Sequence, residues 1–335
     1  MNNDVLNTNI IIPKKGNNSI LVSFVIPTYN RLETLKSTIN SIVPNGKIDY
    51  EIVITDNTDI NRISSTKEYL EGLNNKHISY YVNEKNYGMV DNWNVGLKQS
   101  IGEYIAYIHD DDMIANCYFD VIYELLFNKL KGKNIGFIKA RFNTFSDENS
   151  IIDNKCLTYK YDKIIKFESL LNGIGATYAP TCGILFKKDA LLKIGGFNSN
   201  YHPCADHIVG FKILDIGYEG YITRDIIGHY RWGINESLKK ETLIATVEKN
   251  FAIREYFYSN NFLYSIFGFV FKKYYYTRDA KQYLKYANKF NQQISEDEMI
   301  QRKRDYISCY FIYIIIGLVN RLFVKTCRFI IKFIK

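Results

Sequence analysis

Apolar runs alternate with segments of helical period in the first part of the chain. Residues 21–27 (LVSFVIP) form a β-branched run that stops at Pro27, which predicts a buried strand. In residues 30–43 the apolar residues recur three and four positions apart, so they share one face of a helix. A second apolar run, residues 50–57, ends in polar residues. The order is therefore strand, helix, strand.

This order repeats further along the chain. Residues 62–73 and 89–100 have helical patterns, and residues 78–82 and 103–108 are apolar runs typical of strands. Strands that alternate with helices imply right-handed crossovers and a mainly parallel sheet with helices on both faces. Ligands of such sheets bind beyond the carboxyl ends of the strands. The pattern predicts the α/β class, with a site where the strands end.

The remaining sequence has two other patterns. Between about 140 and 235 the rhythm is less regular, and several glycines suggest loops around short strands. Beyond 240 the sequence is helical and rich in aromatic residues. A C-terminal helical extension is therefore expected to follow the sheet.

Composition and charge narrow the class of protein. The chain has 335 residues and is 47% hydrophobic, which is enough for a sizeable core. Its six cysteines lie far apart with no C-x-x-C pair, which favours a reducing compartment. The first twenty residues lack the pattern of a secretory signal and are interpreted as a polar lead-in. The net charge of +8 is compatible with an acidic partner: nucleic acid, anionic lipid or a phosphorylated substrate.

Three consecutive aspartates, Asp110, Asp111 and Asp112, follow the apolar run 103–108. Three carboxylates that face one crevice repel each other and take up protons unless a cation compensates them. Mg²⁺ and Mn²⁺ prefer oxygen ligands and often share them with phosphates, so a metal that clamps a nucleotide diphosphate accounts for the cluster. The alternative is an Asx turn and the charged N-terminus of a helix that begins near Asn116. The aspartates alone do not decide between the two.

Longer motifs decide among nucleotide-binding classes. No G-x-G-x-x-G motif follows the first strand, and no G-x-x-x-x-G-K-[ST] motif occurs, so the dinucleotide-binding and P-loop classes lack their phosphate-cradling loops here. Four segments instead resemble family 2 glycosyltransferases in order and spacing, over about residues 20–235. These are VSFVIPTYNRLETLKSTINSI, EIVITDN, NYGMVDNWNVGLKQSIGEYIAYIHDDD and TCGILFKKDALLKIGGFN. The resemblance implies a GT-A fold and an inverting transfer from a nucleotide-sugar, of the bacterial surface-polysaccharide type.

The resemblance also implies roles for the nucleotide-binding residues. The first nucleotide-binding loop corresponds to Pro27, Thr28, Tyr29 and Asn30. Asp56 corresponds to the aspartate that contacts the nucleobase.

Further along, Asn86 lies in a segment that resembles the lining of the nucleotide pocket, although Trp93 in the same segment is expected to be core. Asp110 and Asp112 resemble a D-x-D pair. By this resemblance Asp112 binds Mn²⁺ or Mg²⁺, and Asp110 approaches the ribose or the metal. Asp111, between them, is assigned to the nucleotide pocket.

Transfer also needs a general base that takes the proton from the acceptor hydroxyl. The resemblance places this base near Asp206, which follows a proline-containing loop and precedes a helical pattern. The alternative is a plain helix cap. Relatives often carry an acidic residue before this aspartate, and this chain has Ala205 there. His202 and His207 flank Asp206 as alternative bases, although a lone histidine is more often structural.

The segment GHYRWGINES resembles the end of the catalytic domain, where relatives carry an arginine and then a histidine near the diphosphate or the metal. Here Arg231 is followed by Trp232, and His229 precedes it. The resemblance therefore supports Arg231 as a diphosphate contact better than it supports a histidine as a metal ligand.

Residues 306–335 combine an apolar stretch with a basic one. The apolar stretch, residues 306–319, has fourteen residues, fewer than the roughly 20 that span a bilayer. Basic residues then recur at intervals of four and three, on one helical face: Arg321, Lys325, Arg328, Lys332 and Lys335. This pattern is typical of an amphipathic helix in an anionic membrane interface. The alternative is a terminal helix packed on the body with its cationic side in solvent.

The sequence therefore predicts a metal-dependent glycosyltransferase that moves a sugar, most simply from a UDP-sugar, to a hydroxyl of a lipid-linked glycan acceptor. Such a protein would be cytoplasmic and peripheral on the inner face of the cell membrane. A catalytically inactive, membrane-associated binding or scaffold protein is the alternative. No nucleic-acid partner is expected, because the basic tail is the best location for the excess charge and no nucleic-acid motif occurs.

The expected domains follow the same patterns. Residues 1–19 form the lead-in, residues 20–235 the GT-A domain, residues 236–305 a helical aromatic-rich extension, and residues 306–335 the membrane-associating segment.

Overall fold

The computed structural model describes residues 6–14, 19–151, 157–166, 181–233, 238–259 and 262–334. The chain forms two compact units. Unit 1 comprises Met1–Ile164, Ala179–Ser199 and Val209–Trp232, and unit 2 comprises Ile165–Tyr178, Asn200–Ile208 and Gly233–Lys335. Cys156, Lys335 and the domain boundary expected at 235 lie outside the described residues.

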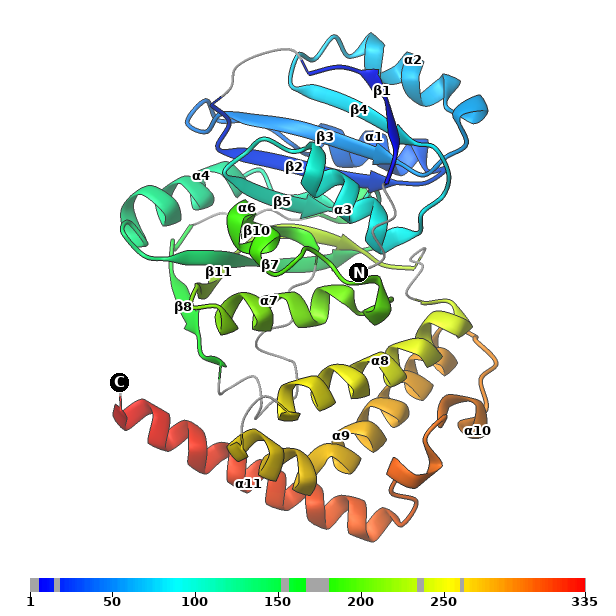
Figure 1. Cartoon of the computed structure of the whole chain (residues 1–335), viewed down its shortest axis with the longest axis vertical. Coiled ribbons are helices and arrows are strands. Elements are labelled where there is room, and N and C mark those ends of the chain that lie inside the picture. The colour runs from blue at the N-terminus through cyan, green and yellow to red at the C-terminus, as the bar shows by residue number, and fades with distance from the viewer. Residues whose placement is uncertain are drawn as a thin grey trace. The chain divides into compact units, whose positions relative to one another are not determined.

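One sheet dominates unit 1 (Figure 1). Its order in the described residues is β1-β4-β3-β2-β5-β10-β7-β11-β6, and β8 also pairs with β11. The first strands are β1 (Thr8–Ile12), β2 (Val22–Thr28), β3 (Tyr50–Asp56), β4 (Ile78–Asn83) and β5 (Tyr104–Ile108). The later ones are β6 (Met113–Ile114), β7 (Ile135–Phe145), β8 (Tyr161–Ile164), β10 (Cys182–Lys187) and β11 (Glu219–Arg231).

The strand directions confirm the α/β prediction. β2 runs parallel to β3 and β5, and β3 runs parallel to β4. β7 and β11 are also parallel, whereas β1, β6, β8 and β10 pair with their neighbours in antiparallel fashion. Residues 8–12, expected in the polar lead-in, thus form an edge strand on β4.

Helices cover both faces of the parallel strands. They are α1 (Leu32–Asn40), α2 (Ser64–Gly72), α3 (Met89–Gln99), α4 (Tyr118–Tyr123), α6 (Lys188–Lys193) and α7 (Ala205–Asp215). Successive residues of a strand point to opposite faces. Phe24 of β2 packs against Phe119 of α4, at 5.4 Å between ring centroids. Val25 packs against α3, where a Cβ on Gly96 would come within 2.3 Å of it. Burial on both faces explains the continuous apolar runs in the sequence.

The region between 140 and 235 differs from the expectation of loops around short strands. β7 has 11 residues and β11 has 13, and they pair along most of their length. Several residues of both strands are exposed or half-buried, and the register of the pair shifts three times, so no uninterrupted apolar run marks them. Gly183 has a φ of 74° and lies at a register shift inside β10, where a bulge favours glycine.

The described part of unit 2 is largely helical, as the sequence predicts beyond residue 240. Its main helices are α8 (Lys240–Ser259), α9 (Phe262–Lys289), α10 (Glu296–Met299) and α11 (Tyr310–Ile334). Val247 and Phe251 of α8 share a buried cluster with Tyr276 and Ala280 of α9. A buried ion pair joins the same two helices, with Arg254 Nη2 2.6 Å from Asp279 Oδ2.

Candidate functional site

The carboxyl ends of three parallel strands lie side by side in unit 1. β2 ends at Thr28, which pairs in register with Asp56 at the end of β3. β5, which also pairs with β2, ends at Ile108 and leads directly into His109 and the three aspartates. The Thr28 hydroxyl donates to Asp110 Oδ2 at 2.7 Å. The fold thus brings together polar residues that lie far apart in the sequence.

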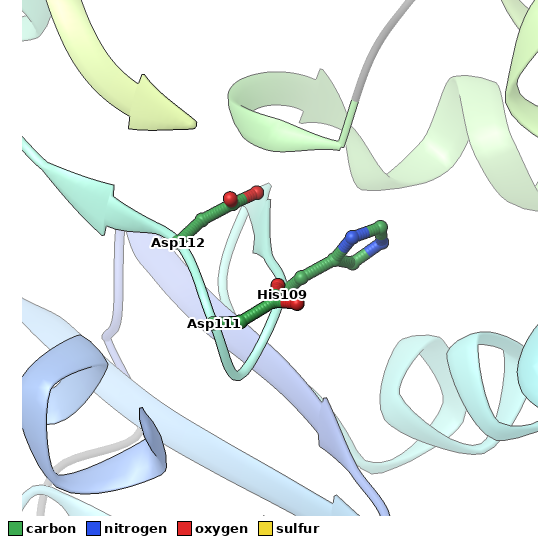
Figure 2. A group of neighbouring side chains, drawn as sticks. All are labelled: His109, Asp111 and Asp112. Atoms are coloured by element: carbon green, nitrogen blue, oxygen red, sulfur yellow. The ribbon is translucent and has the colours of Figure 1, made fainter. Parts of the chain in front are cut away.

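A group of ligand-type side chains lies in the loop between β5 and β6 (Figure 2). His109, Asp111 and Asp112 have ligand atoms within 4.8 Å of one another. Asp112 Oδ1 accepts a hydrogen bond from the backbone N–H of Arg231 at 2.9 Å. Asp112 Oδ2 is buried and has no partner of hydrogen-bond geometry among the described residues, although the buried Cys182 thiol interacts with this carboxyl group. Since buried acceptors are normally satisfied, this oxygen fits a bound cation. Carboxylate donors suit Mn²⁺ or Mg²⁺, whereas an imidazole donor is more typical of transition metals.

Burial and mutual repulsion perturb these carboxyl groups. Burial first, and then the neighbouring Asp111, raise the pKa of Asp110 to about 7, although Thr28 and Arg31 oppose the rise. Burial and the same neighbour also raise the pKa of Asp112. Adjacent buried carboxyl groups thus favour proton uptake, which a bound metal ion would oppose.

Asp110 is not one of the three grouped side chains. Its oxygens accept from the Thr28 hydroxyl and from Arg31 Nη1, the latter at 3.4 Å. Arg31 Nη1 also lies 2.8 Å from Asp111 Oδ2. Arg31 therefore supplies a cation to the site. Contact between Asp110 and a metal or ribose stays a prediction.

A hydrogen-bond contact and a ring contact help to hold the His109 side chain. Its Nε2 lies 2.7 Å from Thr181 Oγ1, and its ring stacks on Trp93 with 5.5 Å between centroids. Trp93 is buried in the core, as the sequence predicts. Neither His109 nor Arg31 was predicted as a site residue. The signals were present, because His109 directly precedes the aspartates and Arg31 directly follows the TYN segment.

Arg231 lies at the end of β11 beside the aspartates. Its Nε donates to the backbone oxygen of Asp111 at 2.8 Å, and its Nη2 forms an ion pair with Glu148. The guanidinium also lies over the Phe145 ring. The structure therefore places Arg231 at the site, although with its charge already paired. Its diphosphate contact stays a prediction. His229 is a buried residue of β11 and pairs with Met113 of β6. It is not part of the group formed by His109, Asp111 and Asp112.

The segment predicted as the first nucleotide-binding loop overlaps the end of β2. Pro27 and Thr28 are buried in the strand, whereas Tyr29 is 48% exposed. Asn30 has a φ of 54°, and its backbone N–H donates to Thr58 Oγ1 at 2.8 Å. The chain therefore turns outward at the end of the strand and presents Tyr29 and Asn30 to solvent.

Asp56 and Asn86 have different surroundings. Asp56 is buried, and its oxygens accept from the Thr58 N–H and the Tyr80 hydroxyl, each at 2.7 Å. Burial raises the pKa of Asp56. Asn86 is exposed and its Oδ1 accepts from the Gly88 N–H at 2.8 Å. The roles of both residues in nucleotide binding stay predictions.

Asp206 lies in the first turn of α7, in the part of the chain that belongs to unit 2. His207 Nε2 is 3.8 Å from Asp206 Oδ1, and His207 Nδ1 is 2.7 Å from Asn250 Oδ1 of α8. A carboxylate in the first turn of a helix is stabilised by the helix dipole. The role of Asp206 as general base stays a prediction.

A family profile decides the affiliation of the chain. The profile described as "Glycosyl transferase family 2" matches residues 23–195, just over half of the chain. The chain belongs to glycosyl transferase family 2. The predicted family is thereby confirmed, and the match includes the loop with the three aspartates.

Curated relatives of this family match parts of the chain. An uncharacterized glycosyltransferase of Haemophilus influenzae is 25% identical over 201 residues, which are 58% of this chain and 62% of that protein. The UDP-Glc:alpha-D-GlcNAc-diphosphoundecaprenol beta-1,3-glucosyltransferase WfgD of Escherichia coli is 26% identical over 149 residues, 44% of this chain and 55% of that protein. The chain thus spans less than two thirds of the length of these relatives.

Solved structures of glycosyltransferases confirm the predicted GT-A fold with C-terminal helices. S. aureus TarS 1–349 in complex with UDP-GlcNAc aligns with a TM-score of 0.59 at 15% identity, over 85% of this chain and 79% of that one. The mannosyltransferase PcManGT from Pyrobaculum calidifontis, in complex with GDP-Man and Mn²⁺, aligns with a TM-score of 0.54 at 13% identity, over 93% of this chain and 90% of that one. At such low identity the likeness concerns the fold.

Proposed function

We propose that this family 2 chain is a metal-dependent inverting glycosyltransferase. It moves a sugar from a nucleotide-sugar, most simply a UDP-sugar, to a hydroxyl of a lipid-linked glycan in surface polysaccharide biosynthesis. The observation that carries the proposal is the buried, unpartnered Oδ2 of Asp112, grouped with His109 and Asp111 where the parallel strands end. This is the edge at which sheets of this class bind ligands.

The proposed chemistry divides between positioning and electrostatics. Asp112, Asp111 and His109 would hold Mn²⁺ or Mg²⁺, which stabilises negative charge on a departing diphosphate. Tyr29 and Asn30 are exposed just beyond the end of β2, where a nucleotide would approach the aspartates. Asp206 takes the proton from the acceptor hydroxyl.

Two observations support a lipid-linked acceptor and a membrane surface as partners. The name of the WfgD relative specifies a diphosphoundecaprenol-linked acceptor for that protein. In this chain, residues Tyr310–Cys327 of α11 have a mean hydropathy of 1.5 and are 17% buried, so the helix is long and apolar enough to cross a membrane by length and composition. The exposed apolar side of α11 favours the membrane interpretation over a helix packed on the body. We therefore place the protein in the cytoplasm, on the inner face of the membrane.

The inactive scaffold is not favoured. Its support is Ala205 before Asp206 and the absence of a histidine after Arg231. The structure offers His109 as a histidine donor from another segment, and all three aspartates remain at the strand ends. A scaffold would have no need to keep buried carboxylates whose repulsion costs stability.

Thermal unfolding with nucleotides tests the proposal. The purified protein is heated with UDP, GDP, CMP or dTDP, each with Mn²⁺ and with EDTA, because a ligand of the folded state raises its stability. We expect a shift in Tm with UDP that EDTA removes. A Tm shift with another nucleotide would show that the donor carries that nucleotide in place of UDP. No Tm shift with any nucleotide would contradict the proposed enzyme.

A further inference from the structure

The first half of α9 presents a second set of large apolar side chains to solvent. Phe262 and Phe269 are 78% and 85% exposed, and Ile266 and Val270 are each 49% exposed. These positions recur at intervals of one, three and four and therefore share one side of the helix. Monomeric soluble proteins rarely expose so many neighbouring large apolar residues, and such patches mark interaction surfaces.

The opposite side of the same helix packs against α11. Phe267 and Phe271 lie 5.7 and 5.9 Å from Phe323, and Tyr274 stacks on Tyr313 at 5.3 Å. The Tyr275 hydroxyl donates to Asn320 Oδ1 at 3.2 Å. The interior side of α9 is thus already occupied, and Phe262, Ile266, Phe269 and Val270 face away from it.

α11 has the same two-sided construction. Tyr313 and Asn320 point toward α9, whereas Phe311, Leu318 and Leu322 are 72%, 54% and 69% exposed. At 100° per residue, these three exposed positions lie roughly opposite the contact positions. Each helix therefore buries one side against the other and leaves an apolar side uncovered.

The charged residues within these two segments are all positive. Residues 262–273 and 306–335 contain no aspartate or glutamate. Lys272 and Lys273 follow the exposed residues of α9, and Arg321 and Lys325 lie on α11. Apolar side chains next to basic ones complement a bilayer with anionic headgroups. The apolar side chains enter the interface, and each basic side chain near the surface is attracted to the headgroups. A protein partner would not require this one-sided charge.

We propose that the first half of α9 and α11 together form one membrane-docking surface, with both helices lying in the plane of an anionic bilayer. The inference rests on the membrane partner proposed above and extends it from one helix to two. It also selects docking over spanning. α11 is bound to α9 between Tyr313 and Phe323, in the middle of its apolar stretch. A spanning α11 would draw Lys272 and Lys273 of α9 into the hydrocarbon, which is costly.

Vesicle co-sedimentation with matched variants tests the surface. The probes are vesicles of mixed phosphatidylglycerol and phosphatidylcholine, and vesicles of phosphatidylcholine alone. The full chain is compared with Phe269→Glu in α9, Phe311→Glu in α11 and Leu192→Glu in α6, a control at another exposed apolar position, 51% exposed. We expect the first two changes each to weaken binding to the anionic vesicles by about tenfold or more, and the control to bind like the wild type.

Several outcomes would overturn the inference. If Phe269→Glu binds the anionic vesicles as tightly as the wild type, α11 alone is the docking element. If alkaline carbonate does not extract the bound protein from the vesicles, a helix spans the bilayer. Loss of a dimer in sedimentation equilibrium, with vesicle binding unchanged, would assign the surface to a second copy of the chain. The Tm shift with nucleotide is measured on every variant. If it persists while no variant or wild type binds vesicles, the membrane inference fails and the proposed enzyme stands.

Discussion

Arg31 Nη1 lies 2.8 Å from Asp111 Oδ2 and 3.4 Å from Asp110 Oδ1. The arginine side chain is 31% exposed, whereas the two carboxylate side chains are 5% and 7% exposed. Arg31 lies in the loop between β2 and α1. This loop therefore places a cation beside the carboxylates that follow β5. This residue offsets part of the repulsion that the aspartate run creates.

Arg31→Ala should lower the stability of the metal-free protein and strengthen Mn²⁺ binding. Removal of the guanidinium leaves buried carboxylates without their cation, at a cost of about 1–3 kcal/mol. The increased negative potential attracts a divalent ion more strongly. Urea unfolding in EDTA and titration with Mn²⁺ measure the two effects. Arg31→Lys should restore most of the lost stability and return the Mn²⁺ affinity toward that of the wild type. Lys36→Ala is the control, because Lys36 is a half-buried cation of α1 that pairs with Glu33 instead of the aspartates. Unchanged Mn²⁺ affinity in Arg31→Ala would contradict the electrostatic account.

Asp112→Asn and His109→Ala should both weaken Mn²⁺ binding. Asn keeps the shape of Asp112 but lacks the charge of its unpartnered oxygen, so binding should become undetectable. His109→Ala removes a donor atom. Thr181→Val removes only the hydrogen bond to His109 Nε2, and loss of such a supporting contact typically costs about 10–100-fold in metal affinity. Electron paramagnetic resonance of free Mn²⁺ gives the affinities. If the His109→Ala variant binds Mn²⁺ more tightly than the Thr181→Val variant does, His109 is not a metal ligand.

Asp206→Asn should separate donor binding from transfer. Loss of a positioned general base lowers the rate by about 10²–10⁴-fold, whereas donor binding does not use this carboxylate. The measurements are sugar transfer to the acceptor and the Tm shift with nucleotide and Mn²⁺. His207→Gln is the matched neighbour and should retain transfer. Full transfer in Asp206→Asn would remove the base assignment, and loss in His207→Gln alone would transfer it to the histidine.

Asp279→Asn should destabilise unit 2. Arg254 and Asp279 are 2% and 3% exposed, so the substitution leaves an uncompensated buried charge, which costs about 3–5 kcal/mol. Denaturant unfolding of Asp279→Asn, Arg254→Met and the double variant measures the coupling. The double variant should lose less than the sum of the single ones. Strict additivity would show that the pair does not interact.

Most of the fold followed from periodicity. The strands β2 to β5 and the helices α1 to α3 agree with their sequence patterns, because buried parallel strands need continuous apolar runs and their helices need one apolar side. β7 and β11 escaped prediction. Partial exposure and register shifts broke their runs, and their pairing joins segments about eighty residues apart.

The candidate site also has one part that the sequence predicts and one part that only the fold shows. The aspartate run is visible in the sequence because its charges are adjacent and follow an apolar strand. The contact of Arg31 with Asp111, the pairing of Thr28 with Asp110, and the contact of Arg231 with Asp112 join residues distant along the chain. No local pattern encodes such contacts. They exist because parallel pairing places the strand ends at one edge of the sheet.

The sequence by itself determined the α/β class, the family and the run of carboxylates, because periodicity and motifs are local properties of the chain. Only the tertiary structure decided which oxygen of Asp112 is left unpartnered and which cation lies beside Asp111. It also decided which sides of α9 and α11 remain uncovered. Each of these depends on what a distant segment buries, and burial and hydrogen bonding are set by packing rather than by neighbours in sequence.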